Sequence, residues 1–342
     1  MIPHLLAIGV AGLGVAAFKG LGLPLPWLLG PICACLIAAL AGVPMRGIKV
    51  LNDGMRTILG VAVGATFTTT LLVSMMGMWP TLLMIPLMVL AIGAVGVPYF
   101  QRLWGFDFAT SYYASMPGGF QDMVLFGEEA GADVRALSLI HATRVMAIVV
   151  ALPFLLSWAW DADLSNPPGA PAASIGTAQL ALMVFCGIAG WQIAKRVGMF
   201  GSSILGPLIL AALFALTGIL QHRPPAEAVW AAQFFIGMSV GTKYTGVTTT
   251  EVRTYVTAAL GFCVILLLLT VVVAETIHLL HLAPAMETIL AFAPGGQAEL
   301  TVLALIVGAD MAFVVAHHVL RIFVVILGAP LFARFFDRPT SK

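Results

Sequence analysis

The sequence predicts an all-α integral membrane protein whose two halves are inverted repeats. Of its 342 residues, 61% are hydrophobic and only 9% are charged, and the mean hydropathy is +1.04. A soluble protein of this size could not cover its surface with so few charges. Two further observations predict this fold class: a series of apolar segments of membrane-spanning length, and a stretch of chain that occurs twice.

The duplicated stretch recurs at an offset of 177 residues, with ten identical pairs of residues. Both copies keep a Pro-Gly-Gly motif, a Gly-Ala-Asp motif and a His-x-x-Arg motif in the same order. Such self-similarity indicates a duplicated structural unit, and its repeated polar residues are the first candidates for function. The matched positions are Pro117, Gly118 and Gly119 with Pro294, Gly295 and Gly296; Gly131, Ala132 and Asp133 with Gly308, Ala309 and Asp310; and His141 and Arg144 with His318 and Arg321.

We therefore expect three regions: a first membrane repeat over 1–158, an external linker over 159–173 and a second membrane repeat over 174–342. A helix needs about 20 apolar residues to cross the hydrocarbon core. Each repeat has five such segments, and an apolar segment broken by the Pro-Gly-Gly motif lies between the fourth and the fifth. The expected spans are 3–20, 25–43, 52–73, 78–100, 132–158, 174–195, 203–220, 228–249, 254–280 and 310–336, and the broken segments are 107–129 and 284–307.

The two broken segments decide the topology, because each can either turn back as a re-entrant hairpin or cross the membrane. Re-entrant segments give inverted repeats of five spans, whereas crossing segments give parallel repeats of six. Basic residues favour the cytoplasmic side of a membrane. The inverted arrangement places twelve of them inside and two outside, but the parallel arrangement places eight inside and six outside. We therefore expect inverted repeats, and a broken helix that crosses completely stays an open alternative.

Two paired glycine motifs concern helix packing. Gly60 and Gly64 form a Gly-x-x-x-Gly motif that returns, again 177 residues later, at Gly237 and Gly241. This spacing places two glycines on one face of a helix, where another backbone can approach closely. We expect these motifs to pack helices against each other.

The Pro-Gly-Gly breaks are the predicted substrate site, with a simple kink as the alternative. A helix interrupted inside a membrane is tolerated only where protein or water satisfies the freed backbone groups. In inverted-repeat transporters, the N-termini of such half-helices present N–H groups and a positive dipole end to a substrate anion. The candidate substrate-binding residues are Gly118, Gly119, Gln121, Gly295, Gly296, Gln297, Arg144 and Arg321.

The two arginines of this set are expected inside the membrane. Arg321 follows Asp310 by eleven residues, about 16 Å of helix. A guanidinium group at that depth must be paired. Two interpretations stay open for Arg144 and Arg321: each holds Glu299 or a backbone carbonyl at the break, or each helps to bind the anion. Asp133 and Asp310 are expected to cap the helices that follow them.

Four ionisable residues are candidate ion-coupling groups: Asp122, Glu299, His141 and His318. The two carboxylates occupy matched positions, three residues after the last glycine of each break. A carboxylate inside a membrane is costly, so a functional role as proton carrier, sodium ligand or partner of an arginine is the first hypothesis. Stabilisation of the helix dipole is the alternative.

Several kinds of site are not predicted. The formal net charge is +1 and no basic element suits nucleic acid, so we expect no nucleic-acid partner. The four cysteines lie in apolar runs without metal-ligand spacing. We predict no metal, no cofactor and no catalytic residues, and we expect that the protein is not an enzyme. The cysteines are Cys33, Cys35, Cys186 and Cys263.

These duplicated motifs, together with Leu-Gly-Pro at 29–31 and 205–207, resemble the AbrB-duplication family of bacterial membrane proteins over nearly the whole chain. The resemblance implies a multi-pass protein of the bacterial cytoplasmic (inner) membrane. Members of the family often carry names that imply an ammonia monooxygenase or a transcriptional regulator, but no copper or iron ligands and no DNA-reading element support either activity here. The overall plan also looks like that of elevator-type secondary transporters.

These observations predict a secondary active transporter of a small organic anion or amino-acid-like solute, coupled to an ion gradient. The expected partners are an anionic small molecule, a proton or sodium ion as the coupling ion, and the lipid bilayer; a homodimer stays open. The alternative is a membrane-embedded enzyme or ligand-sensing regulator that uses the same cavity. Only a transporter would drive uphill uptake into liposomes.

The inverted arrangement makes a topological prediction. Arg102 and Arg253 should be cytoplasmic, and the linker at 161–171 should be external, because this arrangement has the strongest bias of basic residues. Single cysteines introduced at these places, in a chain without its native cysteines, should react with an impermeant maleimide only from the expected side. External labelling at position 102 would contradict the inverted arrangement.

Overall fold

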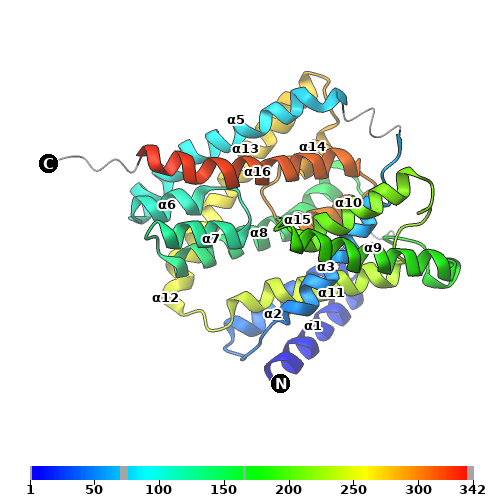
Figure 1. The fold of residues 1–342 in the computed structure, drawn as a ribbon. Coiled ribbons are helices and arrows are strands. Elements are labelled where there is room, and N and C mark those ends of the chain that lie inside the picture. The colour runs from blue at the N-terminus through cyan, green and yellow to red at the C-terminus, as the bar shows by residue number, and fades with distance from the viewer. Residues whose placement is uncertain (1, 70–75, 165–166, 200, 337–342) are drawn as a thin grey trace. The chain divides into compact units, whose positions relative to one another are not determined.

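The computed structural model describes residues 2–69, 76–164, 167–199 and 201–336. These residues form helices with short connections, and no strand occurs among them (Figure 1). The predicted all-α fold is therefore confirmed. The helices of the first half are α1 (Ile2–Gly20), α2 (Pro26–Leu40), α3 (Lys49–Gly64), α5 (Trp79–Pro98), α6 (Phe108–Ser115), α7 (Phe120–Glu129) and α8 (Val134–Trp160).

The second half repeats this order of elements. Its helices are α9 (Thr177–Arg196), α10 (Ser202–Leu216), α11 (Ala226–Gly241), the short α12 (Thr249–Glu251), α13 (Thr257–Leu279), α14 (Ala285–Phe292), α15 (Gln297–Ile306) and α16 (Met311–Phe336). Within the described ranges, six helical stretches are long and apolar enough to cross a membrane, which indicates a multi-pass membrane protein. They are Ile2–Gly20, Trp79–Leu103, Val134–Trp160, Thr177–Arg196, Thr249–Leu279 and Met311–Ala329.

Four of the ten expected spans form shorter helices than the sequence suggested. α2 and α10 have 15 residues each, and α3 and α11 have 16. Fifteen residues give about 23 Å of helix, whereas the hydrocarbon core is about 30 Å thick. The apolar runs are longer than the helices because glycines in the left-handed region end two of them, Gly42 (φ 84°) after α2 and Gly218 (φ 75°) after α10.

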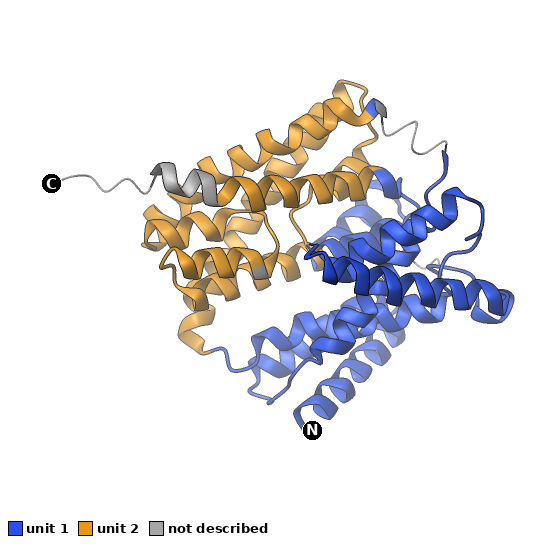
Figure 2. Ribbon diagram, in the orientation of Figure 1, with its two compact units in different colours: residues 1–77, 150–247, 297–312 blue, residues 78–149, 248–296, 313–342 orange. Residues whose placement is uncertain are grey.

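The chain divides into two compact units, and each unit combines segments from both halves of the sequence (Figure 2). Unit 1 holds α1, α2 and α3 together with their counterparts α9, α10 and α11, and also α15. Unit 2 holds α5, α6 and α7 together with α13, α14 and most of α16. These units do not correspond to the two repeats, because each unit takes segments from both. The repeat boundaries at 158 and 174 stay a prediction. Unit 1 is 1–77, 150–247 and 297–312; unit 2 is 78–149, 248–296 and 313–342.

In unit 1, the first Gly-x-x-x-Gly motif packs α3 against α10. A Cβ atom on Gly60 would collide with the carbonyl oxygen of Ile204, and one on Gly64 with the carbonyl oxygen of Leu208. The two backbones are therefore too close for any side chain between them. Here a helix of the first half packs on a helix of the second half.

The second Gly-x-x-x-Gly motif makes the reciprocal contact, because it packs α11 of the second half against α2 of the first. Cβ atoms on Gly237 and Gly241 would collide with the carbonyl oxygens of Leu28 and Ile32. Both motifs therefore pack helices, as expected. The halves of the sequence are joined in unit 1 by two equivalent glycine contacts.

These contacts predict which glycines tolerate a side chain. Gly60→Leu and Gly237→Leu should each destabilise the folded protein by about 1–3 kcal/mol or more, since the added atoms meet backbone that cannot move aside. The control is Gly9→Leu on α1, where nothing lies within 4 Å of the added Cβ. Thermal unfolding in detergent measures the difference, and equal melting temperatures for the three variants would contradict the packing argument.

Candidate functional site

Both Pro-Gly-Gly motifs interrupt a helix, as the sequence predicts. In the first half, residues 116–119 separate α6, of 8 residues, from α7, of 10 residues. In the second half, residues 293–296 separate α14, of 8 residues, from α15, of 10 residues. The broken helix therefore has the same lengths before and after the break in both copies.

The first broken helix turns back on itself. The Asp133 N–H, just before α8, donates to the Oγ1 of Thr110 in the first turn of α6 (2.9 Å). Thr110 is itself held by Asp107, the N-cap of α6, which accepts from the Thr110 N–H at 2.9 Å. The chain thus leaves α7 where it entered α6, and the two helices lie side by side (Figure 1). Residues 108–129 form a helical hairpin with the break at its tip.

Arg144 on α8 reaches the break at the hairpin tip. Its side chain is 2% exposed, and its Nη1 and Nη2 donate to the carbonyl oxygens of Met116 (2.8 Å) and Gly118 (2.9 Å). Carbonyls freed by a helix break in an apolar interior need donors. The planar guanidinium group supplies two donors from one side chain.

Arg321 on α16 makes the equivalent contact in the second half. Its Nη1 donates to the carbonyl oxygens of Ala293 (2.7 Å) and Phe292 (3.4 Å), and the side chain is 4% exposed. Ala293 is 177 residues after Met116, as Arg321 is after Arg144. Of the partners that the sequence left open for the arginines, the structure thus supplies backbone carbonyls of the break. Binding of an anion by either residue stays a prediction.

The matched histidines lie one helical turn before the arginines and are fully buried. The Nε2 of His318 lies 2.9 Å from the carbonyl oxygen of Leu290 on α14. His141 occupies the corresponding position on α8. The neighbouring His317 joins α16 to α5, because its Nε2 lies 2.9 Å from the Oγ1 of Thr81. His317 and His318 therefore brace α16 of the second half, and the role of His141 and His318 in ion coupling stays a prediction.

The two matched carboxylates have different surroundings. Asp122, half-buried on α7, belongs to unit 2, whereas Glu299 on α15 belongs to unit 1 and is 4% exposed.

Gln121 lies in α7, but its side chain is outside the described part of the structure. Gln297 is in the first turn of α15, and its buried Nε2 has no hydrogen-bond partner among the described residues.

A lysine near Glu299 was missed by the sequence analysis as part of the site. Lys243, in the turn after α11, attracts Glu299 electrostatically, and Arg56 on α3 repels the lysine. The inverted arrangement counts Lys243 among the twelve basic residues expected on the cytoplasmic side. Its position within the apolar run 228–249 indicates a buried lysine, but nothing in the sequence indicates that α15 packs near it.

In both copies, the first glycine of the break is buried and the second is partly exposed. Gly118 and Gly295 are buried, whereas Gly119 and Gly296, each directly before the second half-helix, are partly exposed. A ligand could therefore approach each break at its last glycine.

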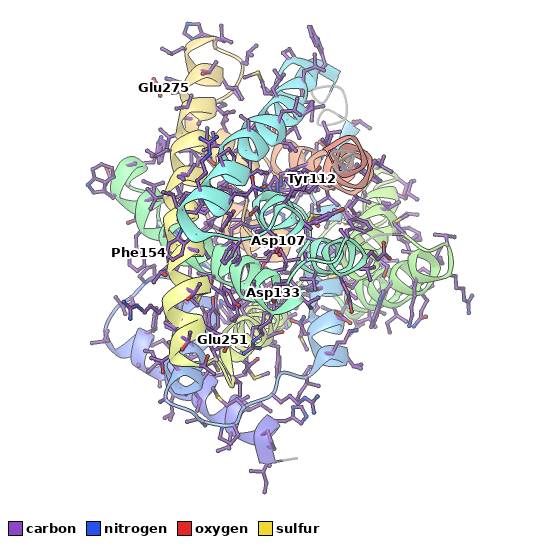
Figure 3. All side chains as sticks on the ribbon, turned by 90° about the vertical axis from the view of Figure 1, so that its left-hand side faces the viewer. Asp107, Tyr112, Asp133, Phe154, Glu251 and Glu275 are labelled. Atoms are coloured by element: carbon purple, nitrogen blue, oxygen red, sulfur yellow. The ribbon has the colours of Figure 1, made fainter. Side chains whose placement is uncertain are left out.

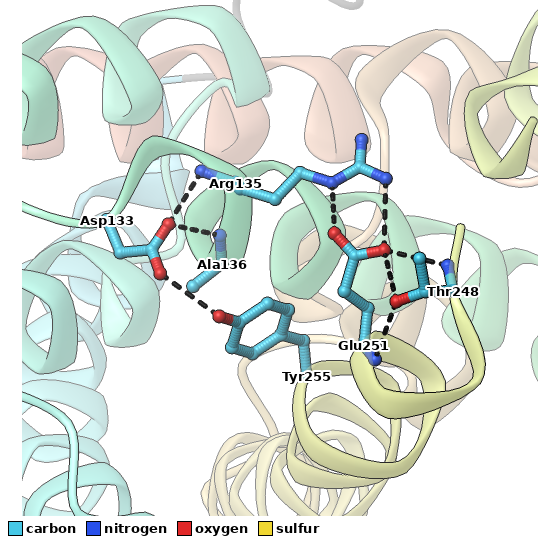
Figure 4. Close-up of polar contacts among 6 residues, drawn as sticks. All are labelled: Asp133, Arg135, Ala136, Thr248, Glu251 and Tyr255. Carbon is cyan, nitrogen blue, oxygen red and sulfur yellow. Dashed lines mark hydrogen bonds and ion pairs between the residues drawn. The ribbon is translucent and has the colours of Figure 1, made fainter. Parts of the chain in front are cut away.

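A network of polar side chains joins the start of α8 to α12 and to the helical segment Val252–Val256 that leads into α13 in unit 2 (Figure 4). Asp133 caps α8, because its Oδ1 accepts from the N–H groups of Arg135 (2.9 Å) and Ala136 (3.0 Å), and its Oδ2 accepts from the Tyr255 hydroxyl. Arg135 donates through Nε and Nη2 to the two carboxylate oxygens of Glu251 (2.5 and 3.2 Å). The predicted cap role of Asp133 is confirmed.

Glu251 is also part of a capping box with Thr248. It lies at one end of the long helical stretch Thr249–Leu279, and the exposed Glu275 lies toward the opposite end (Figure 3). The second copy has Ala312 where the first has Arg135. This network is therefore a feature of one copy and not of the repeat.

The fold and these breaks define a class: polytopic helical membrane proteins with a duplicated, arginine-supported helix break. Within that class the chain belongs to the AbrB family. The family model described as "Transition state regulatory protein AbrB" matches residues 27–337.

Two relatives match nearly the whole chain. "Uncharacterized protein YhjN" of Bacillus subtilis (strain 168) is 25% identical over 363 residues, covering 98% of this chain and 93% of that protein. "Putative regulator AbrB" of Escherichia coli (strain K12) is 24% identical over 330 residues, covering 95% and 94%. The resemblance inferred from the duplicated motifs is thus confirmed.

The contacts of Arg144 and Arg321 predict a stability difference. Arg144→Met and Arg321→Met should each cost about 2–5 kcal/mol, because buried carbonyl oxygens lose charge-assisted donors. The matched control is Arg135→Met, whose side chain is 48% exposed and whose ion pair with Glu251 should contribute about 1 kcal/mol or less. Unfolding in detergent provides the comparison, and equal losses for the three variants would show that the breaks do not depend on the arginines.

Proposed function

We propose that the chain is a secondary active transporter of a small organic anion or amino-acid-like solute, driven by an ion gradient, in the bacterial cytoplasmic membrane. The observation that carries the proposal is the pair of buried guanidinium groups at the two breaks, both in unit 2. Family membership and the six long apolar helices support the membrane setting.

The two guanidinium groups favour an anion because no negative charge neutralises them within the described residues. Their acceptors are backbone carbonyl oxygens, which are neutral, and within the described residues neither arginine is ion-paired with a carboxylate. Arg144 and Arg321 also repel each other electrostatically. An anion bound near the breaks would offset this repulsion, whereas a cation would increase it.

The second half-helix of the hairpin adds donors for the same ligand. α7 begins directly after Gly119, which has no side chain that could cap the helix. The N-terminus of a helix favours a carboxylate or a similar anion, because its dipole has its positive end there. Because Gly119 is partly exposed, a ligand could reach this N-terminus.

An apolar cavity beside the first break favours an organic anion over an inorganic one. The cavity has a volume of about 500 Å³ and lies between α5, α6 and α16 in unit 2. Met116, which accepts from Arg144, lines it together with Gly93 and Val325. A substrate with its charged group at the break could place an apolar body there.

We propose inverted repeats on three grounds. The chain enters α6 and leaves α7 at the same end of the hairpin, as the five-span arrangement requires. The distribution of basic residues favours the same arrangement. Each unit combines corresponding helices of both halves, as in transporters built from internal repeats.

We further propose an elevator-type mechanism in which unit 2 carries the substrate, because unit 2 holds both breaks and both arginines.

Asp122 and Glu299 are the proposed ion-coupling groups, because both are carboxylates on half-helices that follow a break. Glu299 is buried and attracted by Lys243, so a proton or sodium ion bound there would compete with the lysine. The buried His141 and His318 are further candidates for the proton pathway.

Carboxylate variants in proteoliposomes test transport and coupling together. For a solute that wild-type protein accumulates, Asp122→Asn or Glu299→Gln should abolish gradient-driven uptake while substrate counterflow continues, since counterflow needs no net ion movement. Glu275→Gln, at an exposed position on α13, is the matched control and should leave both activities intact.

Unimpaired driven uptake in both carboxylate variants would exclude them as coupling groups. Failure of the wild-type protein to accumulate any solute, over a broad panel of organic and amino acids under proton and sodium gradients, would contradict transport itself.

The printed name of the Escherichia coli relative favours a second candidate, a ligand-sensing regulator. The same arginines would then bind an anion without moving it. Saturable binding of a solute that is never accumulated in liposomes would favour this candidate, and uphill accumulation would exclude it.

A further inference from the structure

A second cavity is lined wholly by residues of unit 1. It has a volume of about 760 Å³, within the range of small-molecule sites. Its walls come from the end of α1, the start of α2, the end of α8 with the chain that follows it, and α11. The proposed transport mechanism does not use this cavity.

Tryptophan rings form one wall of the cavity. The rings of Trp27 and Trp230 stack with centroids 6.1 Å apart and an angle of 17° between their planes. A third ring between them would need about 7 Å, two van der Waals contacts of about 3.5 Å each. A planar ligand therefore cannot enter between these rings, and Lys19 covers Trp27, so the ligand must stack on Trp230 or Trp158. Trp158, 82% exposed, also lines the cavity and offers a further aromatic surface.

A buried amide in this cavity lacks a partner. Gln233 on α11 lines the cavity and is only 2% exposed, and its Nε2 has no hydrogen-bond partner among the described residues. A buried donor without an acceptor is costly in a folded protein. An oxygen atom of a ligand in the cavity would satisfy it.

A lysine in the cavity lining favours a ligand with a negative charge. The exposed Lys19 places its Nζ 4.5 Å from the centroid of the Trp27 ring. Its ammonium group attracts a negative group on a ligand. Asp163, which is already engaged within the chain, also lines the cavity, and its carboxylate repels each negative charge on a ligand, so a monoanion is favoured over a dianion.

We infer that unit 1 binds an aromatic organic monoanion in this cavity. Its ring stacks on the tryptophan wall, an oxygen accepts from the Nε2 of Gln233, and Lys19 attracts its charge. The inference does not depend on the transport proposal, because the cavity lies in one unit and is tested by binding alone.

Calorimetric titration of the full chain in detergent tests the inference, with indole-3-acetate as the probe. Wild-type protein should bind it saturably, and Gln233→Leu should weaken binding about tenfold or more, as expected for the loss of a hydrogen bond to a charged group. The matched control is Gln101→Leu, at an exposed position in unit 2, which should bind as the wild type does.

A second pair of measurements separates charge from packing and does not depend on a buried substitution. Lys19→Gln should weaken binding of indole-3-acetate but leave binding of the neutral indole-3-acetamide unchanged. Gln233→Leu should also raise the melting temperature of the ligand-free protein, because it removes an unsatisfied buried donor.

Three results would overturn the inference: no saturable binding of indole-3-acetate to the wild type, unchanged affinity in Gln233→Leu, or equal effects of Lys19→Gln on the two probes. An anionic lipid headgroup offers similar chemistry, so the titration is repeated with dioctanoyl-phosphatidylglycerol. Binding of this lipid together with the first of these results, no binding of indole-3-acetate, would identify the occupant as a lipid.

Discussion

Backbone carbonyl groups freed by a helix break need donors, and two buried arginines supply them. Water cannot satisfy these groups in an apolar interior, so an unsupported break would be costly. Arg144 and Arg321 reach the breaks from helices that lie 26–29 residues further along the chain. Each arginine thereby fixes a half-helix and also brings a positive charge to the break. Support of the backbone and the proposed attraction for an anion therefore involve the same side chains.

Unit 1 solves a different packing problem with glycine. Its four short helices bring backbones into direct contact at Gly60 and Gly64, and again at Gly237 and Gly241. Apolar side chains gain little from packing against each other when lipid is equally apolar, so close backbone approach is an effective source of attraction. Both contacts join a helix of one half to a helix of the other. The duplicated sequence thus folds as an interlocked pair of halves in this unit.

The two copies share a backbone plan but differ in the side chains around it. Asp122 is matched by Glu299, yet only the second belongs to unit 1, where Lys243 attracts it. The ion pair between Arg135 and Glu251 has no equivalent, because Ala312 replaces the arginine in the second copy. In the proposed transporter, such differences would give the ion and the substrate different surroundings in the two halves.

The sequence alone determined the class of the protein, the place of both helix breaks, the cap at Asp133 and the glycine faces, because these depend on composition and on residues close together in the chain. It did not determine the lengths of α2 and α10, which depend on where the backbone turns left-handed. Nor could it choose carbonyl groups over Glu299 as partners of the arginines, bring Lys243 near Glu299, or place Gln233 in a cavity with Trp27. Those contacts join segments far apart in the sequence, and only the packing of the folded helices decides which of them meet.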